Sequence, residues 1–381
     1  MVESGIDAWL VYDFRGSNPV FGQLVPDKPE TTRRCFLIVP AAGEPTLLVH
    51  AIELGGFEAT ELPCRSFAGR QSMIADLSAA LSGCRRVAME YSPAGELPTM
   101  SWVDAGSMEL FRSLGPEVVS SADLFQAALA TWSEAGLQSH LHASDLVASI
   151  KDEAFDLVRR SLGNGVRLTE CDVQAFISDR FAQLELEADH APMVATNAHS
   201  GDPHYAPQPA TCSVIEPGDW LLIDLWAKQF GDQSLFADIT WVAYAGTSVP
   251  HRMVAVFDIV RSARDLVVDE LNSRLAKGVE VEGWELDGVA RNYISEAGYG
   301  KQFVHRTGHS LGPGPRVHGL GVNLDNLESR DTRRILPRSG FTIEPGIYLT
   351  DFGVRLEIDV YIDPEKGPQI TTPVQDEIIL L

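Results

Sequence analysis

Hydrophobic and polar positions alternate in short stretches over the first third of the chain. Runs of apolar residues predict strands at 8–12, 34–39, 46–49 and 86–90. Apolar residues recur with the period of a helix at 72–81, between the third and fourth of these strands, and at 102–114, after the fourth. We therefore expect residues 1–132 to form a separate and smaller α/β domain.

The pattern changes at residue 134, where apolar residues begin to recur with a helical period that continues to residue 160. Further helices are predicted at 170–186, with Thr169 as the N-cap, and at 251–277 and 284–297. Strand patterns cluster at 189–196, 220–244 and 341–381. Residues 133–381 are thus expected to form an α+β domain with a largely antiparallel sheet.

Four carboxylates stand inside runs that otherwise look like buried strands. They are Asp224, Asp238, Glu344 and Glu357. An ionised carboxylate in apolar surroundings is costly unless a cation or hydrogen-bond donors compensate it. A hairpin with its loop at 227–234 would bring the two aspartates side by side. His309, which follows Gly308, adds an imidazole to these four carboxylates. Each residue alone could be structural, but together they form a ligand set for two divalent metals.

Composition narrows the range of partners. The chain has 381 residues, of which 45% are hydrophobic, as expected for a folded globular protein. Its formal net charge of −23 argues against nucleic-acid and anionic-membrane partners, and no apolar run approaches the roughly 20 residues of a membrane span. The five cysteines are scattered and form no Cys-x-x-Cys pair. We therefore expect a cytoplasmic protein.

The sequence around these residues resembles the pita-bread-fold metallopeptidases, in particular the Xaa-Pro dipeptidases (prolidases) and Xaa-Pro aminopeptidases. The resemblance extends from about residue 134 to the end, and residues 1–132 resemble the family's creatinase-type N-terminal domain. It rests on four strings, Ala237-Asp238-Ile239-Thr240, Thr307-Gly308-His309-Ser310-Leu311-Gly312, Thr342-Ile343-Glu344-Pro345-Gly346-Ile347-Tyr348 and Gly353-Val354-Arg355-Leu356-Glu357. It implies a pita-bread catalytic domain at 133–381, preceded by the smaller α/β domain.

The resemblance also implies a role for each metal ligand. Asp224 would chelate one metal, His309 and Glu344 would hold the other, and Asp238 and Glu357 would bridge the two. Carboxylates can bridge because each has two oxygens, whereas an imidazole offers one lone pair. Oxygen-rich coordination with one nitrogen favours Mn²⁺, although Co²⁺, Zn²⁺ or Fe²⁺ also fit such donors.

Other residues resemble the family's catalytic and substrate-binding set. His204 resembles a histidine that contacts the substrate near the leaving group, and His305 resembles the one four residues before the ligand histidine. His318 resembles the histidine that stabilises the tetrahedral intermediate, with Glu344 moving a proton to the leaving nitrogen. Arg355 resembles an arginine that meets a substrate carboxylate or supports the site. The expected substrate is a small peptide with proline at its second position.

Some positions depart from the family pattern. The spacing from Asp224 to Asp238 is about three residues longer than is common, and Leu225-Trp226 replaces small residues, which would narrow the pocket. His318 lies about two residues further from His309 than is usual. The sequence does not separate a dipeptidase from an aminopeptidase. A creatinase-like amidinohydrolase, a metal-dependent lyase and a non-enzymatic binding scaffold stay as alternatives, and the resemblance implies a homo-oligomer, expected to be a dimer.

Overall fold

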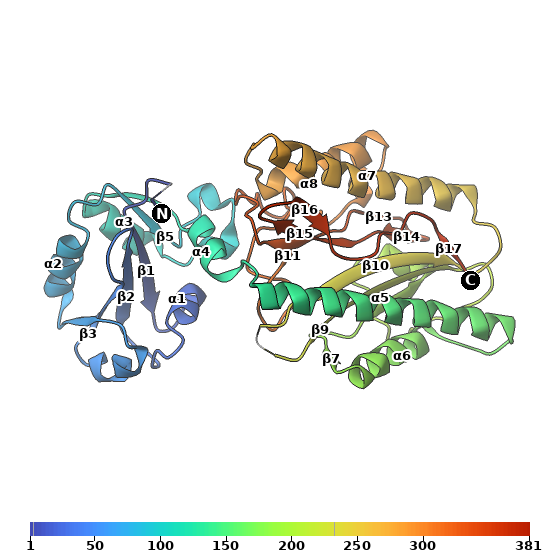
Figure 1. Cartoon of the computed structure of the whole chain (residues 1–381), viewed down its shortest axis with the longest axis horizontal. Helices are drawn as coiled ribbons and strands as arrows, with labels where there is room; N and C mark the ends of the chain where they lie inside the picture. The colour runs from blue at the N-terminus through green and yellow to red at the C-terminus, as the bar shows by residue number, and fades with distance from the viewer. Residues whose placement is uncertain (3, 232) are drawn as a thin grey trace. The chain divides into compact units, whose positions relative to one another are not determined.

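The computed structural model describes residues 1–2, 4–231 and 233–381. The chain divides into two compact units, Met1–Phe125 and Gln126–Leu381, which can be followed by colour in Figure 1. Our assignment of domains to 1–132 and 133–381 stays a prediction. Within the described residues, no helix combines the length and the apolar character needed to cross a membrane.

The first unit is built around a six-stranded sheet with the strand order β4-β3-β2-β1-β5-β6. These strands are β1 (Ala8–Phe14), β2 (Arg34–Pro40), β3 (Thr46–His50), β4 (Cys64–Phe67), β5 (Arg86–Met89) and β6 (Glu117–Ser120). The helices are α1 (Pro19–Leu24), α2 (Arg70–Ala80) and α3 (Ala105–Ser113), while α4 (Ala122–Leu129) crosses into the second unit. The four predicted strands and two predicted helices of this region are confirmed, but β4, β6, α1 and α4 were not predicted.

A buried acid, Glu90, ties together three segments of the first unit. Its carboxylate accepts hydrogen bonds from Trp9 Nε1 (2.7 Å), Asn18 Nδ2 (2.9 Å) and Ser121 Oγ (3.0 Å). Burial raises the pKa of Glu90 to about 6, and these three donors limit the increase. Since both carboxylate oxygens have partners, Glu90 has a structural role between β1, α1 and the start of α4.

The second unit has four long helices on two sides of its sheets (Figure 1). They are α5 (Glu134–Gly163), α6 (Glu170–Gln183), α7 (His251–Ala276) and α8 (Gly283–Glu296). All four were predicted within a few residues. The predicted N-cap is confirmed as well, because Thr169 Oγ1 accepts from the backbone N–H of Asp172 and the Asp172 carboxylate accepts from the backbone N–H of Thr169.

Three groups of strands complete this unit, and they are largely antiparallel, as predicted. The first contains β7 (Leu186–Glu187), β8 (Met193–Thr196), β9 (Trp220–Gln229), β10 (Ala237–Tyr244) and β17 (Ile379–Leu380). The second contains β11 (Ser310–Leu311), β12 (Gly340–Ile343), β15 (Ile358–Asp363) and β16 (Gly367–Ile370). The third is the pair β13 (Gly346–Tyr348) and β14 (Gly353–Arg355).

The hairpin of β9 and β10 presents two different faces. Ile223, Leu225 and Ile239 belong to a core that also contains side chains of α5 and α6. Because successive residues of a strand point to opposite faces, Asp224 and Asp238 lie on the other face. The register pairs Asp224 with Thr240 and Asp238 with Trp226, so the two aspartates are diagonal neighbours rather than direct partners.

The loop of this hairpin is shorter than predicted. Strand β9 continues to Gln229 and β10 starts at Ala237, whereas the sequence pattern placed the loop at 227–234. Strand β9 extends further because Ala227 pairs with Ala237 and both are buried, whereas β10 begins later than the end of the predicted loop. Residue 232, which falls in the predicted loop, lies outside the described residues.

The residues just before α5 belong to the core of the second unit. The Trp132 ring lies against Gly340 of β12, where an added Cβ would come within 1.9 Å of a ring carbon, so a larger residue does not fit. Trp132 Nε1 donates to the carbonyl oxygen of Leu311 (2.8 Å), and the ring stacks on Tyr361 with a centroid distance of 5.3 Å. The chain is therefore fixed to the second group of strands before the long helix begins.

Candidate metal centre

Five predicted ligands collect where the first two groups of strands meet. They are Asp224 on β9, Asp238 on β10, His309 just before β11, Glu344 just after β12, and Glu357 between β14 and β15. The strands are joined here by a hydrogen bond from the backbone N–H of Glu357 to the carbonyl oxygen of Thr240 (3.3 Å) and one from the N–H of Asp238 to Asp359 Oδ2 (2.9 Å). The two glutamates were expected inside strands but lie at strand ends.

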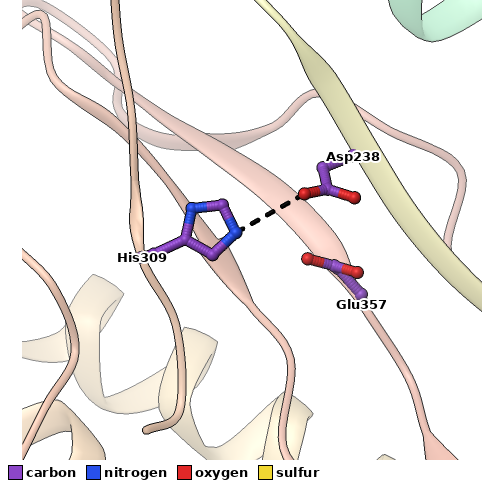
Figure 2. Close-up of side chains that lie close together, drawn as sticks. All are labelled: Asp238, His309 and Glu357. Atoms are coloured by element: carbon purple, nitrogen blue, oxygen red, sulfur yellow. Dashed lines mark ion pairs between the residues drawn. The ribbon is translucent and has the colours of Figure 1, made fainter. Parts of the chain in front are cut away.

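Asp238, His309 and Glu357 face one another, as Figure 2 shows. One ligand atom of each lies within 4.8 Å of the other two, and all three side chains are buried. His309 Nε2 is 3.4 Å from Asp238 Oδ2 and 3.7 Å from Glu344 Oε1. Four of the predicted ligands are therefore within a few ångströms of one another.

The protonation of His309 suits a metal ligand. Its Nδ1 lies 3.1 Å from the carbonyl oxygen of Ser310, so Nδ1 carries the hydrogen and Nε2 has a free lone pair. Burial lowers the pKa of His309 well below its ordinary value, and the neighbouring His318 and Arg306 add to this effect. A neutral imidazole would thus point its lone pair at two carboxylate oxygens, an arrangement that is repulsive unless a proton or a metal cation lies between them.

The carboxylates are only partly compensated: the Arg355 guanidinium pairs with Asp224, and its Nε lies 3.9 Å from Glu344 Oε2. Asp238 Oδ1 is buried and has no hydrogen-bond partner among the described residues. Burial raises the pKa of Asp238 and Glu357 well above the ordinary range, and neighbouring carboxylates raise both further. Burial likewise raises the pKa of Glu344 to about 7, although Arg355 and Arg306 oppose this increase. Metal–ligand bonds of about 2.0–2.2 Å would suit the observed spacing, so the donor set fits divalent cations.

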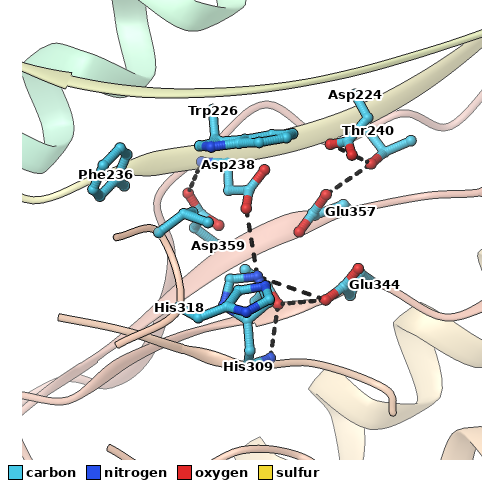
Figure 3. Close-up of polar contacts among 12 residues, drawn as sticks. Asp224, Trp226, Phe236, Asp238, Thr240, His309, His318, Glu344, Glu357 and Asp359 are labelled. Atoms are coloured by element: carbon cyan, nitrogen blue, oxygen red, sulfur yellow. Dashed lines mark hydrogen bonds and ion pairs between the residues drawn. The ribbon is translucent and has the colours of Figure 1, made fainter. Parts of the chain in front are cut away.

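Asp224 has a different environment, because it is ion-paired with Arg355 Nη2. The Thr240 hydroxyl connects this pair to the predicted ligand Glu357: it lies 2.7 Å from Glu357 Oε2 and 3.1 Å from Asp224 Oδ1 (Figure 3), and it accepts from Arg355 Nε (2.9 Å). Arg355 is thus engaged with Asp224 and Thr240. Its predicted contact with a substrate carboxylate stays a prediction.

His318 lies next to His309, with ring centroids 4.2 Å apart. Its Nδ1 is 3.5 Å from Arg306 Nη2, so Nδ1 is the acceptor and Nε2 carries the hydrogen. Part of the His318 ring is exposed to solvent. Burial of the rest of the ring lowers the pKa of His318, and the charge of Arg306 lowers it further. A neutral His318 therefore has an N–H available for donation at the site.

The other two predicted histidines occupy different positions. His305 Nδ1 donates to the carbonyl oxygen of Arg306 (2.7 Å), and its Nε2 accepts from the Tyr348 hydroxyl (2.7 Å). Burial lowers the pKa of His305 to about 3, so it stays neutral. His204 is exposed, and its ring makes no hydrogen bond to another predicted site residue in the described part of the chain. The structure therefore connects His305 with the site but leaves the role of His204 as a prediction.

Glu170, at the start of α6, holds the loop that carries His204. Its Oε1 accepts from the backbone N–H of Thr196 (2.6 Å) and lies 2.9 Å from His199 Nδ1. Its Oε2 accepts from the Tyr205 hydroxyl (2.7 Å) and the backbone N–H of Ser213 (2.7 Å). The fully buried carboxylate thereby links both ends of the segment between β8 and β9.

Three polar residues of the site were not predicted from the sequence. Thr240 follows Asp238 by two positions, and Asp359 follows Glu357 by two, so the period of a strand could have placed Thr240 beside the ligands. Arg306 is three residues before His309, in an irregular segment where no periodicity indicates a direction. All three depend on contacts between distant segments.

Solved structures share this fold. The dipeptidase PepE from Mycobacterium ulcerans has a TM-score of 0.65 and 21% identity, and the alignment covers 100% of this chain and 94% of that one. The X-Pro aminopeptidase from Thermotoga maritima MSB8 has a TM-score of 0.57 and 22% identity, with 99% and 98% covered. Such identities establish the fold alone. They confirm the predicted pita-bread domain preceded by a smaller α/β domain.

Relatives found by sequence similarity match this chain over a shorter region than the solved structures do. A putative dipeptidase, YkvY, from Bacillus subtilis (strain 168) is 29% identical over 238 residues, which are 61% of this chain and 59% of that protein. An Xaa-Pro dipeptidase from Lactobacillus delbrueckii subsp. lactis is 31% identical over 215 residues, or 54% and 51% of the two chains. These matches thus span between half and three fifths of each relative. Residues 109–364 match the sequence model of Metallopeptidase family M24, so the chain belongs to that family.

Proposed function

We propose that this protein is a dinuclear metal-dependent hydrolase that cleaves the peptide bond before proline. The observation that carries the proposal is the lone pair of His309 Nε2, which faces the carboxylates of Asp238 and Glu344 at 3.4 and 3.7 Å. Membership of family M24 supports a metallopeptidase. The name of the Lactobacillus relative, an Xaa-Pro dipeptidase, supports the choice of substrate.

Five residues would hold the two ions. Asp224 would bind one metal, His309 and Glu344 the other, and Asp238 and Glu357 both, because each bridging carboxylate has two oxygens. When bound, the metals would supply Lewis acidity that activates water for attack on the peptide carbonyl. Four carboxylates and one imidazole favour Mn²⁺, although the same donors accept Co²⁺, Zn²⁺ or Fe²⁺.

The chain's own side chains would then move protons and stabilise charge. Glu344 would carry a proton to the leaving nitrogen, because a carboxylate that holds a metal through one oxygen keeps a second oxygen for the proton. His318 would donate its Nε2 hydrogen to the developing oxyanion. His305, fixed between Tyr348 and the Arg306 carbonyl, would support the site rather than react.

A dipeptidase is favoured over an aminopeptidase by one arginine. Within the described residues, the only polar contact of the Arg306 guanidinium is with His318 Nδ1, and no carboxylate lies at ion-pair distance from it. An arginine beside a site this rich in acids would attract a substrate carboxylate, with His204 as a second contact. We therefore expect free Xaa-Pro dipeptides to be the substrates of a cytoplasmic homodimer.

The experiment is Mn²⁺ reconstitution followed by metal analysis and a peptide assay. We expect about two ions per chain and hydrolysis of Ala-Pro, with slower hydrolysis of its C-terminal amide and of tripeptides. Arg261 on α7, which pairs with Asp258, offers a matched control: Arg306→Gln should lose the preference for the free acid, and Arg261→Gln should keep it. Well-folded protein that binds no divalent metal, or binds it and cleaves none of these peptides, would overturn the proposal.

A further inference from the structure

Two half-buried cysteines lie near the start of α6. Cys171 follows Glu170 at the beginning of the helix, and Cys212 precedes Ser213 at the far end of the segment between β8 and β9. Both are free thiols. Neither belongs to the candidate metal centre, so they form a separate group of nucleophilic side chains.

Antiparallel pairing joins the start of α6 to the far end of that segment. Thr169 forms an isolated bridge with Val214, and the backbone N–H of Glu170 donates to the carbonyl oxygen of Ser213 (3.0 Å). The Glu170 carboxylate accepts in return from the backbone N–H of Ser213 (2.7 Å). Main-chain and side-chain hydrogen bonds therefore hold the two stretches of chain side by side.

The next position of this register is the pair of cysteines. In an antiparallel pair, a step forward along one chain matches a step back along the other, so Cys171 comes opposite Cys212. The helix begins here, but the thiols are still neighbours: burial, and then contact with the Cys212 thiol, raise the pKa of Cys171 to about 11. Burial and a hydrogen bond to Glu170 raise the pKa of Tyr205, and the thiols of Cys212 and Cys171 add to that increase, so all three side chains lie close together.

We propose that Cys171 and Cys212 are a modification site, at which a small disulfide such as oxidised glutathione converts the two thiols into a disulfide bond. The bond would join the first turn of α6 to the end of the segment 197–213, which carries His204. Closing this loop covalently should restrict its opening. In the expected cytoplasm the bond would form only when small disulfides accumulate. The inference does not depend on the proposed peptidase activity.

The exchange has two steps that conserve atoms and electrons. The thiolate of one cysteine attacks a sulfur of oxidised glutathione, forms a mixed disulfide and releases one glutathione thiolate. The thiolate of the other cysteine then attacks the protein sulfur of that mixed disulfide and releases the second glutathione. The cysteines lose two electrons and two protons in total, and the two glutathione molecules receive them.

The test is incubation of the folded protein with oxidised glutathione at about pH 8.5, because the thiolate is the attacking species. We expect non-reducing peptide mapping by mass spectrometry to find one main cross-link, between Cys171 and Cys212, which dithiothreitol removes. Hydrogen exchange at 197–213 should slow by at least about tenfold in the cross-linked protein, since the bond opposes local opening.

Cys84 in the first unit gives the matched control. It is also half-buried, and burial raises its pKa. Cys84→Ser should keep both the cross-link and the slower exchange. Cys171→Ser and Cys212→Ser should lose both and leave a glutathione adduct on the remaining cysteine of the pair, while the reduced variants melt at the wild-type Tm.

Two results would overturn the inference. The first is wild-type protein in which Cys171 and Cys212 stay free or carry separate glutathione adducts, without a cross-link between them. The second is a cross-link that leaves hydrogen exchange at 197–213 unchanged, because the bond would then not restrict the segment. Mapping of the wild-type protein decides the first point even if a serine variant fails to fold, and a negative peptidase assay affects neither point.

Discussion

At the level of single residues, protons and metals compete for the same oxygens. Burial and neighbouring acids raise the pKa of Asp238 and Glu357, and burial brings that of Glu344 to about 7. Each acid must lose its proton before it binds a metal, so lower pH opposes binding. We therefore expect Mn²⁺ affinity to increase from about pH 6 to about pH 8 with release of protons, measured by titration calorimetry in buffers of different ionisation enthalpy.

An exposed acid provides the comparison for this titration. Asp258 lies on α7 and pairs with Arg261 (3.1 Å), so Asp258→Asn should leave the pH dependence of Mn²⁺ binding unchanged. Glu357→Gln should weaken binding at every pH and reduce proton release. An affinity that is constant between the two pH values, without proton release, would show that these acids are not the ligands.

His318 and His204 are expected to affect different kinetic constants. His318→Ala should lower kcat by about 10²–10³, the usual effect of removing one oxyanion donor, while metal content and Tm stay near wild type. His204→Ala should act mainly through KM, since a contact kept equally in ground and transition states contributes uniform binding. Steady-state kinetics with Ala-Pro separates the two, and an unchanged kcat in His318→Ala would remove that histidine from the mechanism.

At the level of elements, the segment between β8 and β9 depends on Glu170. In Glu170→Gln, an amide N–H₂ would replace one acceptor oxygen, and a buried donor such as the Ser213 N–H would lose its partner. We expect a loss of about 1–3 kcal/mol in unfolding free energy and faster hydrogen exchange at 197–213. Denaturant unfolding and exchange mass spectrometry measure both quantities.

Glu153 provides a matched surface glutamate on the neighbouring helix α5. It pairs with Arg180 of α6 (2.6 Å) but is 37% exposed. Glu153→Gln should therefore cost less than about 1 kcal/mol and leave exchange at 197–213 unchanged. Equal effects of the two substitutions would mean that the buried carboxylate does not hold the loop.

The elements show which features the sequence could predict. Periodicity identified the long helices and the β9–β10 hairpin, because each buries one continuous apolar face, as Leu225 and Ile239 do. It did not give the register, in which Asp224 pairs with Thr240 and not with Asp238. A shift of the pairing by two residues leaves the alternation of core-facing and opposite positions unchanged, so the sequence pattern does not distinguish the two registers. Contacts between distant segments, such as Arg306 with His318, depend on tertiary packing and left no local signal.

At the level of the whole molecule, the two units should respond differently to pH. The pKa of Glu90 is raised to about 6 in the folded first unit, so the folded state holds this proton more tightly than the unfolded chain. Its contribution to stability is therefore fully present below about pH 4.5 and is lost as the pH rises through about 6, a change of about 2 kcal/mol. Local unfolding free energies from hydrogen exchange in β1 and β5 should show this decrease, which Glu90→Gln should abolish.

An exposed glutamate of the same sheet gives the control. Glu117 on β6 pairs with Arg86 (3.3 Å) and is 64% exposed, so Glu117→Gln should retain the wild-type pH dependence. Peptides from β9 and β10 in the second unit should not respond to Glu90→Gln. If the pH dependence of the first unit persists in Glu90→Gln, another group is responsible for it.

The position of Trp132 has a practical consequence for anyone who isolates the catalytic half. Its ring covers Gly340, which cannot supply a side chain of its own, and its backbone N–H donates to the carbonyl oxygen of Arg338 (2.7 Å). A recombinant fragment that starts at residue 133 would leave a hole at the edge of β12, whereas one that starts at residue 126 keeps the ring. The choice of first residue would therefore affect how stably such a fragment folds.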